Sequence, residues 1–147
     1  MWISKRTDYA TRAVLALALA DGDSAVKLED LADRAAIPAS VLEQIMPTLR
    51  TAGIVRSERG ARGGYRLNHA PAEITLERVV RLFQGQLAPI GCATRSMPEP
   101  CPMAEDCSLR FIWEDVREAT IRVLSETTFE QLAERAGGRW RQRVEAL

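Results

Sequence analysis

The first third of the chain has the hydrophobic spacing of helices. Over residues 5–20 apolar side chains recur every three or four positions, which predicts an amphipathic helix with one buried stripe. The segment 21–23, Asp-Gly-Asp, is expected to end this helix. A second, short helix is predicted to end near Ala35, and Ile37-Pro38 marks the turn after it.

A third helix is expected over residues 41–52. Ser40 followed three positions later by Glu43 has the pattern of a capping box, in which each side chain bonds the backbone amide of the other residue. Gly53 suits the left-handed position that ends a helix. Pro47 lies inside the segment, where it removes one backbone hydrogen bond and is expected to kink the helix near Glu43.

The spacing then changes to that of strands. Two short apolar runs, at 54–57 and 65–67, flank a segment of glycines and arginines at 58–64, which predicts a β-hairpin. Helix, turn, helix and hairpin in this order are typical of a winged helix-turn-helix. The predicted fold class is therefore mainly α with a small β-wing.

The second half begins with Thr75, which is expected to cap a helix over residues 76–84 that Gly85 stops. The segment 86–106 carries four prolines and two of the chain's three cysteines, with the third cysteine directly after it, and predicts an irregular loop.

A long amphipathic helix is predicted over residues 108–126. Its apolar stripe consists of Ile112, Val116, Ala119 and Val123. A helix this long has little of its own domain to pack on, so it is expected to mediate dimerisation, and folding back on its own domain is the alternative. A short last helix is expected over 128–136, followed by an arginine-rich tail without an assigned structure.

Three regions follow from these elements. Residues 1–84 are expected to form a DNA-binding winged helix-turn-helix, residues 85–107 a cysteine-bearing loop, and residues 108–147 the dimerisation helix with a C-terminal helix.

Composition and charge narrow the possible functions. The 147 residues are 46% hydrophobic and 27% charged, which is typical of a globular chain. No apolar run is long enough to span a membrane, and charges interrupt the early run after Lys5-Arg6, so a cytoplasmic location is expected. Twenty basic residues balance twenty acidic ones, yet residues 47–69 hold five arginines against Glu58 alone. This basic stretch favours nucleic-acid binding.

The cysteines are the other chemical feature. Cys92, Cys101 and Cys107 are all the cysteines of the chain, in the spacing C-x8-C-x5-C. An odd number of thiols in a reducing compartment is poorly suited to structural disulfides. Soft thiolates suit an iron–sulfur cluster or zinc, and redox-active free thiols are a third interpretation. The spacing by itself leaves these three open.

Nothing in the sequence indicates catalysis. It contains no paired acids, nucleophile triad or phosphate-binding loop, and Gly60, Gly63 and Gly64 fall within a hairpin instead of at a strand-to-helix turn. No nucleotide cofactor is therefore expected, and the chain is predicted not to be an enzyme. An electron carrier is the least supported class, because a four-cysteine ferredoxin run is missing.

Several segments together carry a family resemblance that covers nearly the whole chain. They are Ser40-Val41-Leu42-Glu43-Gln44, Leu49-Arg50, Gly53-Ile54-Val55, Arg59-Gly60, Gly63-Gly64-Tyr65, Ile74-Thr75-Leu76, the three-cysteine loop, Trp113 and Thr127-Thr128-Phe129-Glu130-Gln131-Leu132. In these segments the chain resembles the Rrf family of bacterial regulators, the winged-helix repressors and activators of the IscR, NsrR and RirA types.

The resemblance implies a homodimer that binds a palindromic operator in double-stranded DNA, most simply as a repressor. It implies an iron–sulfur cluster near the subunit boundary, of the 4Fe-4S or 2Fe-2S type, with Cys92, Cys101 and Cys107 as ligands. That cluster would sense iron supply, nitric oxide or redox state and alter DNA affinity. It would tie the loop of one subunit to the first helix of the other and so fix the separation of the two recognition helices.

The fourth ligand distinguishes the branches of the family. In the IscR type a histidine follows the last cysteine by three positions, where this chain has Arg110, and its one histidine, His69, is expected to be solvent-exposed. In the NsrR type an aspartate of the partner subunit's first helix completes the site, and Asp8 stands at the matching place. The alternative for Asp8 is a local ion pair with Arg12, one turn later. The wide gap between the first two cysteines leaves a RirA-like site with a non-protein ligand open.

Six side chains are expected to contact DNA. They are Ser40, Glu43, Gln44, Arg50, Arg59 and Arg62. The three at the start of the third helix are placed to contact base edges, although the capping box competes for Glu43. Arg50, at the end of this helix, is placed to contact a phosphate. The two hairpin arginines suit a narrow minor groove.

One alternative within the family stays open. A cluster-free regulator of the same fold would respond to thiol oxidation or to a partner protein or small molecule. It would bind DNA equally well with all three cysteines changed to alanine.

Overall fold

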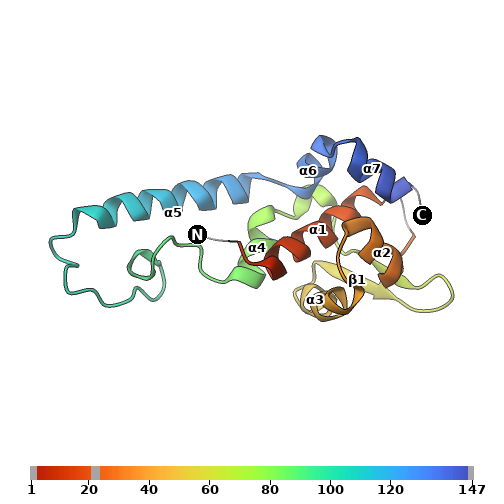
Figure 1. Ribbon diagram of the computed structural model, residues 1–147, viewed down its shortest axis with the longest axis horizontal. Helices are drawn as coiled ribbons and strands as arrows, with labels where there is room; N and C mark the ends of the chain where they lie inside the picture. Colours follow the sequence, from red (N-terminus) through yellow and green to blue (C-terminus); the bar gives the residue numbers. More distant parts are fainter. Residues whose placement is uncertain (1–2, 21–23, 146–147) are drawn as a thin grey trace.

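The computed structural model describes residues 3–20 and 24–145, and it is mainly helical with one two-stranded antiparallel sheet (Figure 1). Its elements are α1 (Lys5–Leu19), α2 (Leu28–Ala35), α3 (Ala39–Thr51), β1 (Val55–Glu58), β2 (Gly64–Leu67), η1 (Pro71–Glu73), α4 (Leu76–Gln84), η2 (Gly91–Ala93), α5 (Ser108–Glu126), α6 (Phe129–Arg135) and α7 (Gly138–Glu145). The predicted fold class is confirmed. The predicted end of the first helix at 21–23 lies outside the described residues.

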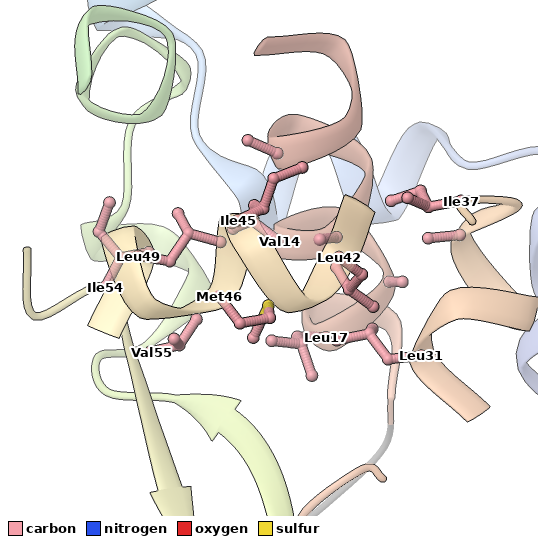
Figure 2. Close-up of a cluster of buried hydrophobic side chains, with 14 of the residues drawn as sticks. Val14, Leu17, Leu31, Ile37, Leu42, Ile45, Met46, Leu49, Ile54 and Val55 are labelled. Atoms are coloured by element: carbon pink, nitrogen blue, oxygen red, sulfur yellow. The ribbon is translucent and has the colours of Figure 1, made fainter. Parts of the chain in front are cut away.

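The hydrophobic core lies where α3 crosses α1 and α2 (Figure 2). The buried face of α3 consists of Leu42, Ile45, Met46 and Leu49. This face packs with Val14 and Leu17 of α1 and Leu31 of α2, all of which belong to the same buried cluster. Burying each large side chain contributes about 1.5–3 kcal/mol. The core therefore fixes α3 firmly and leaves its opposite face in solvent.

The start of α3 differs from the prediction. The helix begins at Ala39, with Pro38 at the N-cap and without a side-chain cap, so the predicted capping box of Ser40 and Glu43 is wrong. The Pro38 carbonyl already accepts a hydrogen bond from the Leu42 amide at 3.1 Å, which places Ser40 inside the helix. Proline is compatible with this position because the N-cap residue has a non-helical backbone, here with ψ 131°, and φ −57° is close to the value that proline imposes.

The end of α3 agrees with the prediction. The helix runs from Ala39 to Thr51 with Pro47 inside it, and the kink expected near Glu43 stays a prediction. Gly53 follows with the predicted positive φ of 71°.

The hairpin forms the predicted wing. β1 and β2 pair in antiparallel register from Val55 opposite Leu67 to Glu58 opposite Gly64. Tyr65 forms a further bridge to Val26, with hydrogen bonds of 2.8 and 2.9 Å. This bridge attaches the wing to the segment before α2.

The chain leaves this body after α4 and returns beside the start of α4 (Figure 1). The helix α4 has the predicted bounds and the predicted Thr75 cap. The predicted loop at 86–106 is irregular except for η2, and the predicted helix α5 follows it. At the far end of α5, a bridge between Thr75 and Thr128 brings the chain back to the body.

The C-terminal helices complete the body. Phe129, the first residue of α6, is fully buried in the core beside α1. The arginine-rich tail forms α7, which had no predicted structure and which contacts α1 and α2. Arg143 donates a hydrogen bond to the Asp33 carbonyl at 3.1 Å. None of the described helices has the length and apolar character needed to cross a membrane.

Candidate functional site

The solvent-facing side of α3 presents the side chains that were predicted to read bases. Ser40, Glu43 and Gln44 are exposed on its first two turns, opposite the buried face. Arg50 is exposed on its last turn. Within residues 3–20 and 24–145 none of these four side chains forms an ion pair or side-chain hydrogen bond, so each is available to a ligand.

The wing tip adds two exposed arginines. Arg59 and Arg62 lie between β1 and β2 and have no ion-pair partner among the described residues. The acid of this stretch, Glu58, is already engaged by Arg66 at 3.2 Å and lies 3.9 Å from Arg56. The strand arginines therefore neutralise Glu58, and the positive charge of the tip remains uncompensated.

All three cysteines gather at a second site, at the other end of the molecule. They line one cavity of about 190 Å³, which we call the cysteine pocket. Its lining residues are Cys92, Pro98, Glu99, Pro100, Cys101, Ala104, Cys107 and Arg110. Figure 1 shows that the segment 86–107 and α5 project together as an arm, away from α3 and the wing.

Two different elements position the outer cysteines. Cys92 lies in the 3-10 turn η2, which packs against α5, and Cys107 is the N-cap residue of α5. Cys101 lies in the irregular segment between them. All three thiols are free and half-buried. The predicted ligands are thus brought together around the first turn of α5.

The cysteines do not close around a single point. Across the described ranges, no three His, Cys, Asp or Glu side chains converge closely enough to hold one metal ion. A structural zinc site needs four donors about 2.3 Å from one ion when the donors are sulfur. In a 4Fe-4S cluster each ligand binds a different iron atom, whereas in a 2Fe-2S cluster two ligands share each iron atom. Among the described residues the three thiols therefore form no preassembled site for a single metal ion, and this arrangement does not discriminate between a cluster and free thiols.

Arg110 occupies the position where a histidine ligand would stand. Its Nε donates a hydrogen bond of 2.9 Å to Glu114 Oε1. The Glu114 carboxylate raises the pKa of Arg110 above its ordinary value, and the nearby Cys92 and Cys107 thiolates act in the same direction. This residue contributes a fixed positive charge to the pocket and cannot serve as a ligand.

The remaining two predictions concern Asp8 and His69. Asp8 lies on the first turn of α1 and pairs with Arg12 at 2.9 Å, as the local interpretation predicted. It does not line the cysteine pocket of its own subunit. Ligation by Asp8 across a subunit boundary stays a prediction. His69 is exposed, as predicted.

A polar network that was not predicted fastens the cysteine loop to α5. Arg117 donates to Glu118 at 2.8 Å and also to the carbonyl of Ala93 in η2. Arg95 donates to the same carboxylate, with Nε at 3.1 Å from Oε1. These hydrogen bonds, from Arg95 first and then from Arg117, lower the pKa of Glu118. The turn that carries Cys92 is thereby held against the middle of α5.

The helix α5 has one inner and one outer face. The inner face is half-buried and consists of Arg110, Glu114, Arg117, Ile121 and Leu124. The outer face is exposed and consists of Leu109, Ile112, Val116, Ala119 and Val123. Val123, for example, is 60% exposed. The predicted apolar stripe is thus present on the outer face and is not covered by the described part of this chain.

Comparisons with known proteins agree with this architecture. The family model Rrf2, described as an iron-dependent transcriptional regulator, matches residues 3–135. An rrf2-like helix-turn-helix regulator of Rhodobacter capsulatus is 34% identical over 136 residues, or 88% of this chain and 91% of its own. The regulator NsrR of Geobacillus kaustophilus is 33% identical, over 91% of this chain and 90% of its own.

Two solved structures have the same fold. The structure of CymR, the global cysteine regulator of B. subtilis, superposes with a TM-score of 0.75 at 30% identity, over 93% of this chain and 99% of its own. The structure of T. potens IscR gives a TM-score of 0.75 at 28% identity, over 93% of this chain and 89% of its own.

Proposed function

Since the chain belongs to the Rrf2 family of transcriptional regulators, we propose that it is a homodimeric, DNA-binding repressor whose iron–sulfur cluster senses iron, nitric oxide or redox state. Its role is regulatory rather than enzymatic, and it acts in the cytoplasm. The observation that carries the cluster proposal is that all three cysteines line one pocket at the start of α5.

The DNA-binding part rests on the exposed face of α3 and on the wing. Gln44 suits adenine and Glu43 suits cytosine in the major groove, and Ser40 is able to bond either base. Arg50 is placed for a phosphate contact, which positions the helix without specifying sequence. Arg59 and Arg62 at the wing tip suit the negative potential of a narrow minor groove. A twofold dimer would present two such surfaces to a palindromic operator.

The cysteine pocket would hold the cluster through Cys92, Cys101 and Cys107. When bound, a cluster supplies iron that iron limitation, oxygen or nitric oxide removes or modifies. Cys107 is the N-cap of α5, and Cys92 is fastened to the same helix through η2 and Arg117. The ligands are therefore attached to the helix that we expect to form the dimer. A change in the ligands would reach α5, and through it the separation of the two recognition helices.

A cluster-free regulator is the second candidate. It is favoured by the free, half-buried state of the three thiols and by the Arg110 guanidinium beside them. In such a regulator, oxidation of the three free thiols would be the signal.

The first experiment separates these two candidates. The protein is purified under strict anaerobiosis, its visible absorbance is recorded, and iron and acid-labile sulfide are assayed on the same sample. We expect a brown protein with matched iron and sulfide, whose amounts per monomer distinguish the 2Fe-2S from the 4Fe-4S type.

A Cys92→Ala, Cys101→Ala, Cys107→Ala variant is the control. It should be colourless, and its operator affinity should no longer respond to the signal. If the wild-type protein contains neither iron nor sulfide even after reconstitution, the cluster proposal is wrong and the cluster-free regulator replaces it.

A further inference from the structure

The cysteine pocket contains a carboxylate that had no role in the sequence-based predictions. Glu99 lines the pocket together with Cys92, Cys101 and Cys107. We propose that Glu99, from the same loop as the cysteines, is the oxygen ligand that completes the cluster site. This inference rests on the proposed function, because it requires that a cluster binds.

The backbone around Glu99 is unusually restricted. Pro98 and Pro100 flank it, and proline fixes its own φ near −65°. The residue before a proline is confined to extended conformations, which applies to Glu99 itself. The Glu99 amide donates a hydrogen bond to the Gly91 carbonyl at 3.2 Å, next to Cys92. The loop therefore folds back and holds Glu99 at the turn that carries the first cysteine.

The Glu99 side chain, like the Glu99 amide, lies against Gly91. Its carboxylate fills the space beside Gly91 in which a Cβ atom would lie. In the part of the chain that the structure describes, this carboxylate accepts no hydrogen bond and forms no ion pair. The Asp8 carboxylate, by contrast, is paired with Arg12 at 2.9 Å. Glu99, an exposed residue that lines the pocket, thus has free oxygen donors, while the Asp8 carboxylate is paired with Arg12.

We expect a cation to bind among these donors, because their charges are negative when they act as ligands. Cysteines bind a cluster as thiolates, so a loaded pocket would hold three thiolates and one carboxylate. Arg110 is the basic residue that lines the pocket, and its guanidinium is shared with Glu114. Iron bound between the donors would offset the remaining negative charge. A hard carboxylate beside soft thiolates would also make the Glu99 bond the most labile of the four.

The test compares three single variants with the wild type. Glu99→Gln keeps the size of the side chain and removes the charged donor, and Asp8→Asn does the same on α1. Glu105→Gln is the matched control, because Glu105 lies exposed on the same loop but does not line the cysteine pocket. Each protein is reconstituted anaerobically with ferrous iron and sulfide. Iron content, visible circular dichroism and the rate of iron release to a chelator are then measured.

We expect Glu99→Gln to release iron on the order of tenfold faster than the wild type and to change the visible circular dichroism. Glu105→Gln and Asp8→Asn should match the wild type. Equal far-UV circular dichroism of the metal-free proteins shows that the variants fold alike.

Two results would overturn the inference. If Glu99→Gln keeps the wild-type spectrum and release rate, Glu99 is not a ligand, and an altered Asp8→Asn protein would assign the site to the first helix. If the wild type itself takes up no cluster, the proposed function fails together with the inference. These failures are distinguishable, because only the second one leaves the wild type colourless.

Discussion

At the scale of single residues, Gly64 shows how closely the wing approaches the body. Its φ is +154°, and a Cβ atom there would overlap the backbone carbonyl of Val26. The neighbouring Tyr65 amide donates to that same carbonyl at 2.8 Å, so neither backbone is free to move aside without losing the bridge.

Gly64→Ala is therefore expected to lower the free energy of unfolding by about 1–3 kcal/mol, because the added methyl group forces the two backbones apart. Urea denaturation followed by circular dichroism measures this effect. Gly137→Ala is the control, since no atom lies within 4 Å of its Cβ position, and its effect should stay within about 0.5 kcal/mol. Equal denaturation midpoints for both variants would contradict the prediction.

Local sequence chemistry predicted some residues well and others poorly. The Thr75 cap forms as expected because a hydroxyl at that position bonds the Arg78 amide whatever surrounds it. The Ser40 cap does not form, because Pro38 starts the helix two residues earlier. Glu99 gave no sequence signal beyond its flanking prolines, since its place in the pocket depends on a loop that folds back on Gly91. Contacts across such a loop are not encoded in local spacing.

At the scale of elements, the link between η2 and α5 is the least predictable feature. Helical spacing predicted the bounds of α5, but it carries no information about which loop a charged side chain will meet. The sequence analysis makes no prediction for Arg95, Arg117 and Glu118, and in the structure they fasten the cysteine loop. The helix α7 was missed for a related reason. Its glycines and arginines are typical of a tail, and contacts with α1 and α2 stabilise it.

Glu118→Gln is expected to loosen the cysteine loop, because the neutral amide bonds two guanidinium groups weakly. Limited proteolysis should cut within residues 85–107 several times faster than in the wild type, because one charge-assisted contact is weakened. Glu130→Gln on α6 is a suitable control, because its side chain has no partner within the described ranges. Identical cleavage rates in the wild type and Glu118→Gln would show that this network does not hold the loop.

The same network has a defined pH dependence. Because the pKa of Glu118 is lowered in the folded protein, its contribution is fully present above the unfolded value, about 4.3, and is lost as the pH falls through the lower, folded value. Loop cleavage by an acid-stable protease should therefore rise only in this acidic range. In Glu118→Gln the cleavage rate should show no such rise.

At the scale of the whole molecule, the outer face of α5 is the clearest exposed apolar surface of the described residues. Leu109 is 61% exposed and Ile112 is 55% exposed, on a helix that projects from the body (Figure 1). An apolar stripe of this kind in water marks an interaction site, and a second copy of the same helix is the occupant we propose.

Val116→Glu places a charge in the middle of this stripe. We expect it to raise the dissociation constant of the dimer by roughly tenfold to a hundredfold, because the charge would be buried without a partner. Analytical ultracentrifugation measures the change, and affinity for a two-half-site operator should fall with it. Arg122→Gln lies about a quarter turn away from the stripe and should leave self-association unchanged. An unaltered dimer in Val116→Glu would place the interface elsewhere.

The burial of Phe129 has a consequence for how the protein is made. This side chain fills the core of the DNA-binding body, yet it is encoded after the cysteine loop and after α5. A nascent chain that has been translated only through α4 lacks a central part of that core. During synthesis the surface that reads DNA is therefore completed only after the sensing loop and the long helix have emerged from the ribosome. An incomplete chain, released early, would carry the recognition helix without a finished core and would be open to proteolysis before it could occupy an operator.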